Sequence, residues 1–330
     1  MRKTVSRFSF LWTTLLALLA PPAQATSIQE IFPILAKDGV VFGQDEPIRV
    51  TYYGVSTLLF DDGETQILID GFFSRPDLSK VLLGLIEPDK DLLGEIHKNE
   101  GLDRLAAVVV AHSHHDHALD SAEIAKLADA QLIASYSTRN IGIGRALNPN
   151  NFLLPSDAAT CRCGKFRVEL IPSGHFDGGF LFERITGIGK QIAEPVTFPA
   201  RIKDFNEGAS FSILVSHPTK TFLIQASAGY KSGALKGTRA DVLFLGIGGI
   251  SRSKDPDIFA TYFRETIGQV HPELIVPIHW DSFFKPASAQ TTNPALDNIQ
   301  KTADKLDEFL KADDRFKDIS VAAIIPKSVR

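Results

Sequence analysis

Apolar runs rich in β-branched residues alternate along the chain with turn signals and with helical patterns. The run Ile48 to Phe60, the turn Asp61-Asp62-Gly63 and the run Thr65 to Asp70 predict a β-hairpin. Further apolar runs predict strands at Ala106 to Ala111, Gln131 to Ala134, Lys165 to Pro172, Phe211 to Val215, Thr221 to Gln225, Asp241 to Leu245, Glu273 to Ile278 and Val321 to Ile325. Strands interleaved with helical segments predict a mixed α/β fold.

Apolar residues at helical spacing predict helices between several of these strands. The expected helices are Asp91 to Leu105, Ser121 to Ala130, Pro294 to Lys311 and a helix opened by Asp255-Pro256. Asp120, with Glu123 three residues later, predicts a capped helix start. No repeat, low-complexity segment or obvious linker divides the chain, so we predict a single domain over residues 26–330.

The composition excludes several classes of protein. The chain has 330 residues, of which 44% are hydrophobic and 22% charged, which is typical of a globular domain and excludes disordered and fibrous proteins. The formal net charge is −4, so the protein lacks the basic field on which binding to nucleic-acid phosphates depends. We therefore expect a small-molecule partner rather than a nucleic acid.

The first 25 residues have the anatomy of a secretory signal peptide. Three basic residues lie within the first seven, Phe8 to Ala20 is apolar, and Ala23-Gln24-Ala25 is a small-x-small cleavage site. The apolar run is shorter than the ~20 residues that span a bilayer, which argues against a membrane anchor. We expect cleavage after Ala25 and an exported mature protein in a bacterial periplasm.

Two cysteines, Cys161 and Cys163, are too few for a disulfide scaffold or a four-cysteine zinc site. At positions i and i+2 of a strand they would point to one face, but a bridge between them would close a small, strained ring. The simplest interpretation is a pair of half-buried strand residues whose role stays open.

The chemistry of the chain is concentrated in the segment Ala111-His112-Ser113-His114-His115-Asp116-His117. Four of the nine histidines lie in it, directly after a predicted buried strand. His112 and His114 are two apart in extended chain and can share one cation, while Asp116 and His117 turn toward a neighbouring position. Imidazole and carboxylate ligands together suit zinc, and manganese or iron would accept the same set.

At these residues the sequence resembles the metallo-β-lactamase superfamily of hydrolases, and the resemblance extends over about Ile48 to Phe284. In that family further histidines follow two later strands, and His175 in Ile-Pro-Ser-Gly-His and His279 in Val-Pro-Ile-His-Trp fit those places. The Val-Pro-Ile-His-Trp segment and the predicted hairpin look more like the lactonase-like branch than like typical β-lactamases. The implied fold is an αββα sandwich.

The resemblance also implies two metal sites and up to two zinc ions per chain. His112, His114 and His175 would hold one ion, and Asp116, His117 and His279 the other. Asp116 would have a second, catalytic role as orienter of the nucleophile and carrier of its proton. The remaining histidines match no ligand position: His97, His115, His217 and His271.

One departure from the family concerns a bridging aspartate that many members carry in a Gly-Asp-Thr-like turn. The matching turn here is Ala226-Ser227-Ala228-Gly229-Tyr230, which places Ser227 where that aspartate would be. Two divalent ions, one carboxylate and a bridging hydroxide leave a formal +2 core, where a bridging aspartate would leave +1. Such a core should bind its second ion less tightly and hold anionic transition states better. A single-metal or inactive protein is the alternative.

The implied function is an exported zinc-dependent hydrolase that uses a metal-bound hydroxide to cleave an ester, lactone, amide or phosphodiester bond of a small molecule. A metallo-β-lactamase proper and a non-catalytic zinc-binding domain of the same fold are the alternatives. The ligands are shared across these activities and do not name the substrate, and the sequence does not fix the oligomeric state.

Two segments near the predicted site allow more than one interpretation. Gly246-Ile247-Gly248-Gly249 follows a strand but lacks the spacing of a dinucleotide-binding loop, so we interpret it as a tight turn lining the cleft. The irregular stretch Phe176 to Gly208 exceeds a normal connection. Its phenylalanines form either an apolar lid over the site or ordinary packing: Phe176, Phe180, Phe182 and Phe198.

Overall fold

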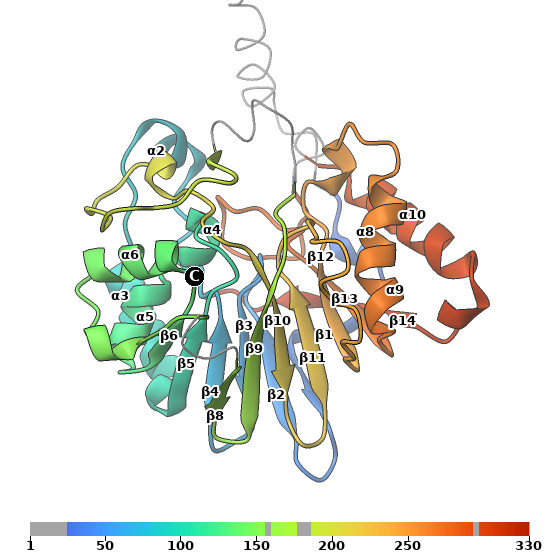
Figure 1. Cartoon of the computed structure of the whole chain (residues 1–330), viewed down its shortest axis with the longest axis horizontal. Coiled ribbons are helices and arrows are strands. Elements are labelled where there is room, and N and C mark those ends of the chain that lie inside the picture. The colour runs from blue at the N-terminus through green and yellow to red at the C-terminus, as the bar shows by residue number, and fades with distance from the viewer. Residues whose placement is uncertain (1–24, 156–159, 177–185, 293–296, 330) are drawn as a thin grey trace, which may run out of the picture.

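The computed structural model describes residues 25–155, 160–176, 186–292 and 297–329. Within these residues two β-sheets pack face to face and helices cover their outer faces (Figure 1). Phe60 of the first sheet meets Phe222 and Phe244 of the second, with ring centroids 5.1 and 6.1 Å apart. The predicted αββα sandwich is therefore confirmed.

The first sheet is 8-stranded and the second 7-stranded within the described residues. The first has the order β15 (Ala323–Pro326), β1 (Ile34–Phe42), β2 (Ile48–Tyr52), β3 (Leu58–Asp61), β4 (Gln66–Ile69), β5 (Leu105–Val109), β6 (Gln131–Ile133) and β7 (Phe152–Leu153). The second has the order β14 (Ser320–Val321), β13 (Leu274–Ile278), β12 (Val242–Gly246), β11 (Thr221–Gln225), β10 (Phe211–Ser216), β9 (Phe166–Pro172) and β8 (Thr160–Cys163).

Helices lie on the outer face of each sheet (Figure 1). The α-helices are α2 (Leu78–Leu83), α3 (Lys90–Asn99), α4 (His115–Ala118), α5 (Ser121–Leu127), α6 (Tyr136–Gly144), α8 (Ile258–Glu265), α9 (Ile267–Val270) and α10 (Ile299–Lys311). Short 3₁₀ helices are η1 (Ile28–Glu30), η2 (Leu102–Arg104), η3 (Pro149–Asn151), η4 (Ile202–Asp204), η5 (Ile250–Arg252) and η6 (Asp314–Phe316). No helix in the described part of the chain is both long enough and apolar enough to cross a membrane.

The predicted hairpin over Ile48 to Asp70 is wrong in its first half, because that run is two strands rather than one. Gly54, with φ of +91°, turns the chain between β2 and β3, and its carbonyl accepts a hydrogen bond from Thr57 N–H. The left-handed region is open to glycine without steric cost. The segment is therefore an antiparallel meander of β2, β3 and β4.

Two helix predictions fail at their ends for identifiable reasons. The helix predicted to reach Leu105 ends at Asn99, because Gly101 adopts a left-handed conformation with φ of +59°. The predicted cap of α5 is wrong, because the Asp120 carboxylate accepts hydrogen bonds from the Phe73 and Ser74 backbone N–H groups instead. Asp120 thus fixes the chain after β4 rather than the start of α5.

The carboxyl-terminal half shows similar shifts at element boundaries. The helix expected at Pro256 begins at Ile258, and α10 begins after Asn298, whose side chain accepts a hydrogen bond from Lys301 N–H. The predicted start of α10 at Pro294 lies outside the described residues. The strand predicted over Val321 to Ile325 is two short strands, β14 and β15, which join different sheets.

Strand direction places the predicted ligands at one edge of the sandwich. In the first sheet β4, β5 and β6 are parallel, so their carboxyl ends meet at the same edge. In the second sheet β11, β12 and β13 are parallel, and β9 runs the same way because β10 is antiparallel to both β9 and β11. The His112–His117 segment follows β5, His175 follows β9 and His279 follows β13, which brings all three to the edge where α4 lies (Figure 1).

Candidate metal centre

The histidine-rich segment folds as the extended exit of a strand followed by one helical turn. β5 ends at Val109, and His114, with φ of −61° and ψ of 153°, is the last extended residue before α4. Asp116 and His117 lie in α4, so they point to a different place from His112 and His114. This change of backbone conformation divides the segment between two clusters.

The first cluster is formed by His112, His114 and His175, which we call the three-histidine cluster. One ring nitrogen from each lies within 4.8 Å of the others. His112 Nε2 is 3.1 Å from His114 Nδ1, which is 3.2 Å from His175 Nε2.

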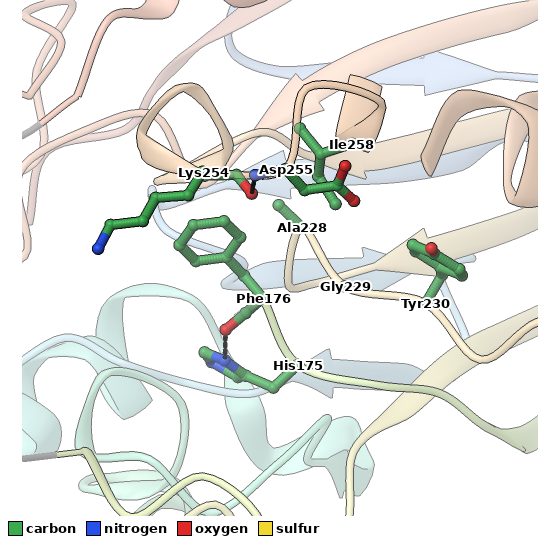
Figure 2. Close-up of a pocket in the computed structure, with 9 residues that line it drawn as sticks. His175, Phe176, Ala228, Gly229, Tyr230, Lys254, Asp255 and Ile258 are labelled. Carbon is green, nitrogen blue, oxygen red and sulfur yellow. Dashed lines mark hydrogen bonds between the residues drawn. The ribbon is translucent and has the colours of Figure 1, made fainter. Parts of the chain in front are cut away.

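The outer ring nitrogens of this cluster determine where the protons are. His114 Nε2 donates to the Thr186 carbonyl at 2.9 Å, and His175 Nδ1 donates to the Phe176 carbonyl at 2.8 Å (Figure 2). In the neutral rings the inward nitrogens of His114 and His175 therefore carry lone pairs, which face each other at 3.2 Å. A cation between them would relieve that repulsion, so the donor set fits a metal ion.

The second cluster is formed by Asp116, His117 and His279, which we call the aspartate cluster. Its ligand atoms also lie within 4.8 Å of one another. Asp116 Oδ2 is 3.5 Å from His117 Nε2 and 3.4 Å from His279 Nε2, and the two ring nitrogens are 3.3 Å apart. Two imidazoles and one carboxylate are a ligand set that zinc accepts.

Asp70 orients His117 from behind and was given no role in the sequence analysis. Its Oδ2 accepts a hydrogen bond from His117 Nδ1 at 2.8 Å and from Ser56 Oγ, and its Oδ1 accepts one from Ala111 N–H at 2.8 Å. This partner fixes the tautomer in which His117 Nε2 is free for a ligand. Asp70 is the last residue of the predicted strand Thr65 to Asp70. Its carboxylate at the end of a strand was the feature of the sequence that could have indicated a supporting role at the site.

Burial and neighbouring charges set the protonation of both clusters. Burial, followed by the neighbouring histidines, lowers the pKa of His112 and His114 well below its usual range, so both rings are neutral and able to bind metal at pH 7. Burial raises the pKa of Asp116, but His117, His279 and His115 outweigh it and hold the pKa well below its ordinary value. Burial lowers the pKa of His117, and the Asp116 and Asp70 carboxylates raise it above its ordinary value.

A buried ion pair supports the loop that carries His279. His279 adopts a left-handed backbone with φ of +62°, and its N–H donates to the Val55 carbonyl at 2.6 Å. Val55 N–H in turn donates to Asp281 Oδ1 at 2.7 Å, while Arg75 Nη1 pairs with Asp281 Oδ2 at 2.8 Å. At Gly248 a Cβ would lie 2.5 Å from His279 Nδ1, so the interpretation of Gly246–Gly249 as a turn lining the site agrees with this contact.

The two clusters are neighbours, since the rings of His112 and His117 have centroids 3.9 Å apart. His115 belongs to neither cluster and packs its ring against the edge of Phe72 at 5.9 Å. The other three unassigned histidines also lie outside both clusters: His97, His217 and His271. The structure thus brings together the six residues that the sequence analysis selected, and their role as ligands stays a prediction.

Ser227 lies in the turn after β11, beside the segment that carries His175. Its Oγ accepts a hydrogen bond from Phe176 N–H at 3.2 Å. A Cβ on Gly229 would lie 2.3 Å from the His175 carbonyl carbon, so this turn packs closely against the chain that positions His175. Contact between Ser227 and a metal ion stays a prediction.

Replacing Ser227 with aspartate should tighten the weaker of two zinc ions if the residue occupies the bridging position. A charged ligand should contribute on the order of 1–3 kcal/mol, which lowers the second dissociation constant by about tenfold to a hundredfold. Ser227→Ala should leave metal binding nearly unchanged, because a neutral hydroxyl is a weak ligand. Zinc titrations of the three proteins make the comparison, and an aspartate variant that binds no more tightly would show that Ser227 does not face the ions.

In the described residues, the two cysteines are unbridged residues of a strand, and Phe198 of the long irregular stretch is packed among its neighbours. Cys161 and Cys163 are unbridged on β8, with Sγ atoms 3.5 Å apart and on one face, and the Cys163 thiol lowers the pKa of Cys161 to about 7. Phe198 packs against Phe205 at 6.0 Å and beneath the Arg145 guanidinium at 4.9 Å, as ordinary packing predicts. Phe180 and Phe182 lie outside the described residues.

The family model of the Metallo-beta-lactamase superfamily matches residues 50–223. This range includes all three residues of the three-histidine cluster. The chain belongs to the metallo-beta-lactamase superfamily. This confirms the family and the fold that the histidine motif indicated, while the lactonase-like branch stays a prediction.

Curated relatives of this superfamily member carry the name UPF0173 metal-dependent hydrolase. One from Heliobacterium modesticaldum is 24% identical over 72% of the chain and 84% of the relative. One from Anaeromyxobacter dehalogenans is 28% identical over 74% of the chain and 77% of the relative. Together with the family match and the two clusters, they identify the chain as a metal-dependent hydrolase of the superfamily.

A solved structure shares the fold. Igni18, described as a novel metallo hydrolase from Ignicoccus hospitalis, matches with a TM-score of 0.50 and 16% identity, over 85% of this chain and 96% of that one. At this identity the likeness shows the fold alone.

Proposed function

We propose that this member of the superfamily is an exported zinc-dependent hydrolase that cleaves an ester, lactone, amide or phosphodiester bond of a small molecule. The observation that carries the proposal is the pair of adjacent clusters, each offering three ligand atoms within 4.8 Å. Three protein ligands leave a coordination position open, as catalytic zinc requires and structural zinc does not. Zinc would supply Lewis acidity and a water that is deprotonated near neutral pH.

The chain's own residues would hold the ions rigidly. The hydrogen bonds of His114 to Thr186 and of His175 to Phe176 fix both rings from outside. Asp70 does the same for His117. Such outer partners set the tautomer and the ring orientation, so the site is formed before metal or substrate arrives.

Asp116 would have two roles, as ligand and as orienter of the attacking water. Its pKa is held well below the ordinary value, chiefly by His117 against the effect of burial, so it is ionised at neutral pH. An ionised carboxylate accepts a hydrogen bond from the nucleophile and aligns it. A proton that Asp116 receives would be passed on readily, because the low pKa disfavours its retention.

The charge of the two clusters favours substrates that develop negative charge. Asp116 is the one carboxylate among the six residues of the two clusters, and Ser227 is neutral. Two zinc ions with one carboxylate and one hydroxide carry a formal charge of +2, which stabilises an oxyanion formed at an attacked carbonyl or phosphorus. An exported enzyme would meet its substrates in the periplasm. The net charge of −4 disfavours RNA as substrate.

A panel of chromogenic esters, lactones, phosphodiesters and β-lactams, assayed with and without zinc, tests this function. We expect zinc-dependent turnover of at least one ester, lactone or phosphodiester. Turnover confined to β-lactams would instead identify a metallo-β-lactamase proper. Zinc binding without turnover of any substrate in the panel would identify the non-catalytic zinc-binding alternative.

Export is tested at the amino terminus of the mature protein; residues 1–24 lie outside the described residues. We expect a mature protein that begins at Thr26, because Ala23-Gln24-Ala25 fits the processing rule. Intact-mass measurement of the protein recovered from the periplasm checks this. An intact Met1, or a lipid-modified terminus, would contradict it.

A further inference from the structure

A cavity of about 290 Å³ adjoins the three-histidine cluster on the side of the second sheet. Its lining comes from three segments: the chain after β9, the turn after β11 and the segment that leads into the first turn of α8 (Figure 2). The lining residues are His175, Phe176, Ala228, Gly229, Tyr230, Ser253, Lys254, Asp255 and Ile258. His175 belongs to both the cavity and the cluster, so a ligand in the cavity would lie next to the metal centre.

Part of the inner surface of the cavity is apolar. The Phe176 ring, the Ala228 methyl group and the Ile258 side chain point toward one another (Figure 2). Ala228 and Gly229, which follow Ser227 in the turn after β11, also line the cavity. A short hydrocarbon chain fits such a surface, since burying it gains about 25 cal/mol per Å² of apolar area.

Lys254 supplies the cationic group of the cavity. The residue is exposed, and no ion pair involves its ammonium within the described part of the chain. In Figure 2 its side chain runs beside the Phe176 ring and extends away from Ala228 and Ile258. The ammonium is therefore free to pair with an anion held at the mouth of the cavity.

The acidic residue of the lining does not neutralise this lysine. The Asp255 carboxylate accepts a hydrogen bond from Asp257 N–H at 2.9 Å, which engages it in its own turn. It also points to the opposite side of the cavity from the Lys254 side chain (Figure 2). The cavity thus combines apolar side chains, the cationic Lys254 at its edge and the candidate metal ligand His175.

We propose that this cavity is the acyl pocket of the enzyme and that it selects esters or lactones whose acyl chain ends in a carboxylate, paired with Lys254. The proposal rests on the proposed hydrolase function and names the substrate class of the same site. In the reaction, water adds to the acyl carbon and the bond to the leaving oxygen breaks. One proton of the water goes to the leaving oxygen and the other to the solvent, so an ester gives an alcohol and a dicarboxylate, whereas a lactone gives a single hydroxy dicarboxylate.

Two esters of equal acyl length provide the test. Mono-4-nitrophenyl glutarate carries a distal carboxylate, and 4-nitrophenyl pentanoate carries a methyl group in its place. With zinc-loaded protein we expect a lower KM for the glutarate ester. Lys254→Met should raise that KM about fivefold and leave the pentanoate KM unchanged, as the loss of one solvent-exposed charge pair predicts.

Matched variants make the test specific for charge at this position. Lys254→Arg should retain the preference for the glutarate ester, and Lys254→Glu should reverse it. Lys317→Met, a neutralised exposed lysine outside the lining, should behave as wild type. A second readout without turnover is the shift of the Ala228 methyl NMR signal on titration with glutarate, which Lys254→Met should weaken by a similar factor.

The outcomes separate this inference from the function on which it rests. A wild-type enzyme that treats both esters alike, or a Lys254→Met variant that keeps the preference, would overturn the acyl pocket while leaving the hydrolase intact. If neither ester is hydrolysed, cleavage of 4-nitrophenyl esters of this acyl length is refuted. The glutarate titration then decides the pocket by itself: binding that depends on Lys254 supports it, and binding that does not refutes it.

Discussion

His114→Ala should remove the ion held by the three-histidine cluster and nearly all hydrolytic activity. His114 Nδ1 is the central atom of that cluster, 3.1 Å from His112 Nε2 and 3.2 Å from His175 Nε2. Two remaining imidazoles are fewer than the three ligands of a catalytic zinc site. Without the ion the pKa of the attacking water returns to the high value of bulk water, so we expect turnover to fall by about three orders of magnitude or more.

His115→Ala is the matched control, because it removes the adjacent histidine of the same segment. His115 is buried but belongs to neither cluster. Zinc content by elemental analysis and turnover of the best substrate in the panel should stay near wild type in this variant. Equal losses in the two variants would show that the segment binds metal in a different register.

Asp70→Asn should weaken the ion of the aspartate cluster without abolishing that of the three-histidine cluster. The Asp70 carboxylate holds His117 Nδ1 at 2.8 Å and so keeps Nε2 turned toward Asp116 and His279. Loss of an outer partner of a ligating histidine typically costs 10- to 100-fold in metal affinity. Zinc titration should therefore show one dissociation constant nearly unchanged and the other raised by about that factor.

A second buried histidine–aspartate pair provides the control for Asp70. His217 Nε2 is 3.6 Å from Asp62 Oδ2, and both side chains are buried. This pair lies outside both clusters, so Asp62→Asn should leave both zinc affinities unchanged even if it lowers stability. Equal weakening by Asp62→Asn and Asp70→Asn would reduce the role of Asp70 to general support of the fold.

The fold was predictable because its strands carry strong local signals. The strands β11 and β13 lie at the predicted places, since apolar runs of this length between turn signals have few other interpretations. Element ends were less predictable, because tertiary contacts decide them. The Asp120 carboxylate bonds to the chain after β4 rather than to its own helix, which no local pattern reveals.

The six candidate ligands were predictable and their supports were not. Histidines and an aspartate concentrated after buried strands are rare enough to indicate metal chemistry from sequence. Thr186 contributes through its carbonyl oxygen, for which the identity of the side chain gives no signal. Asp281 acts through the backbone of Val55, a residue separated from it by most of the chain, so only the folded structure connects them.

The acyl pocket was also out of reach of the sequence. Lys254 is one of many exposed lysines, and its position next to Phe176 depends on the packing of the segment before α8 against the chain after β9. Ala228 and Gly229 follow Ser227, the residue of this turn that departs from the family pattern. In the structure both residues line the cavity.

Anomalous diffraction at the zinc edge from crystals of the zinc-loaded protein tests the central claim most directly. We predict two anomalous peaks, one bound by His112, His114 and His175 and the other by Asp116, His117 and His279. Both peaks should disappear after soaking with a chelator and return when zinc is restored. Zinc bound elsewhere in the chain, or the absence of a peak at both clusters, would contradict the assignment of a metal centre to these six residues.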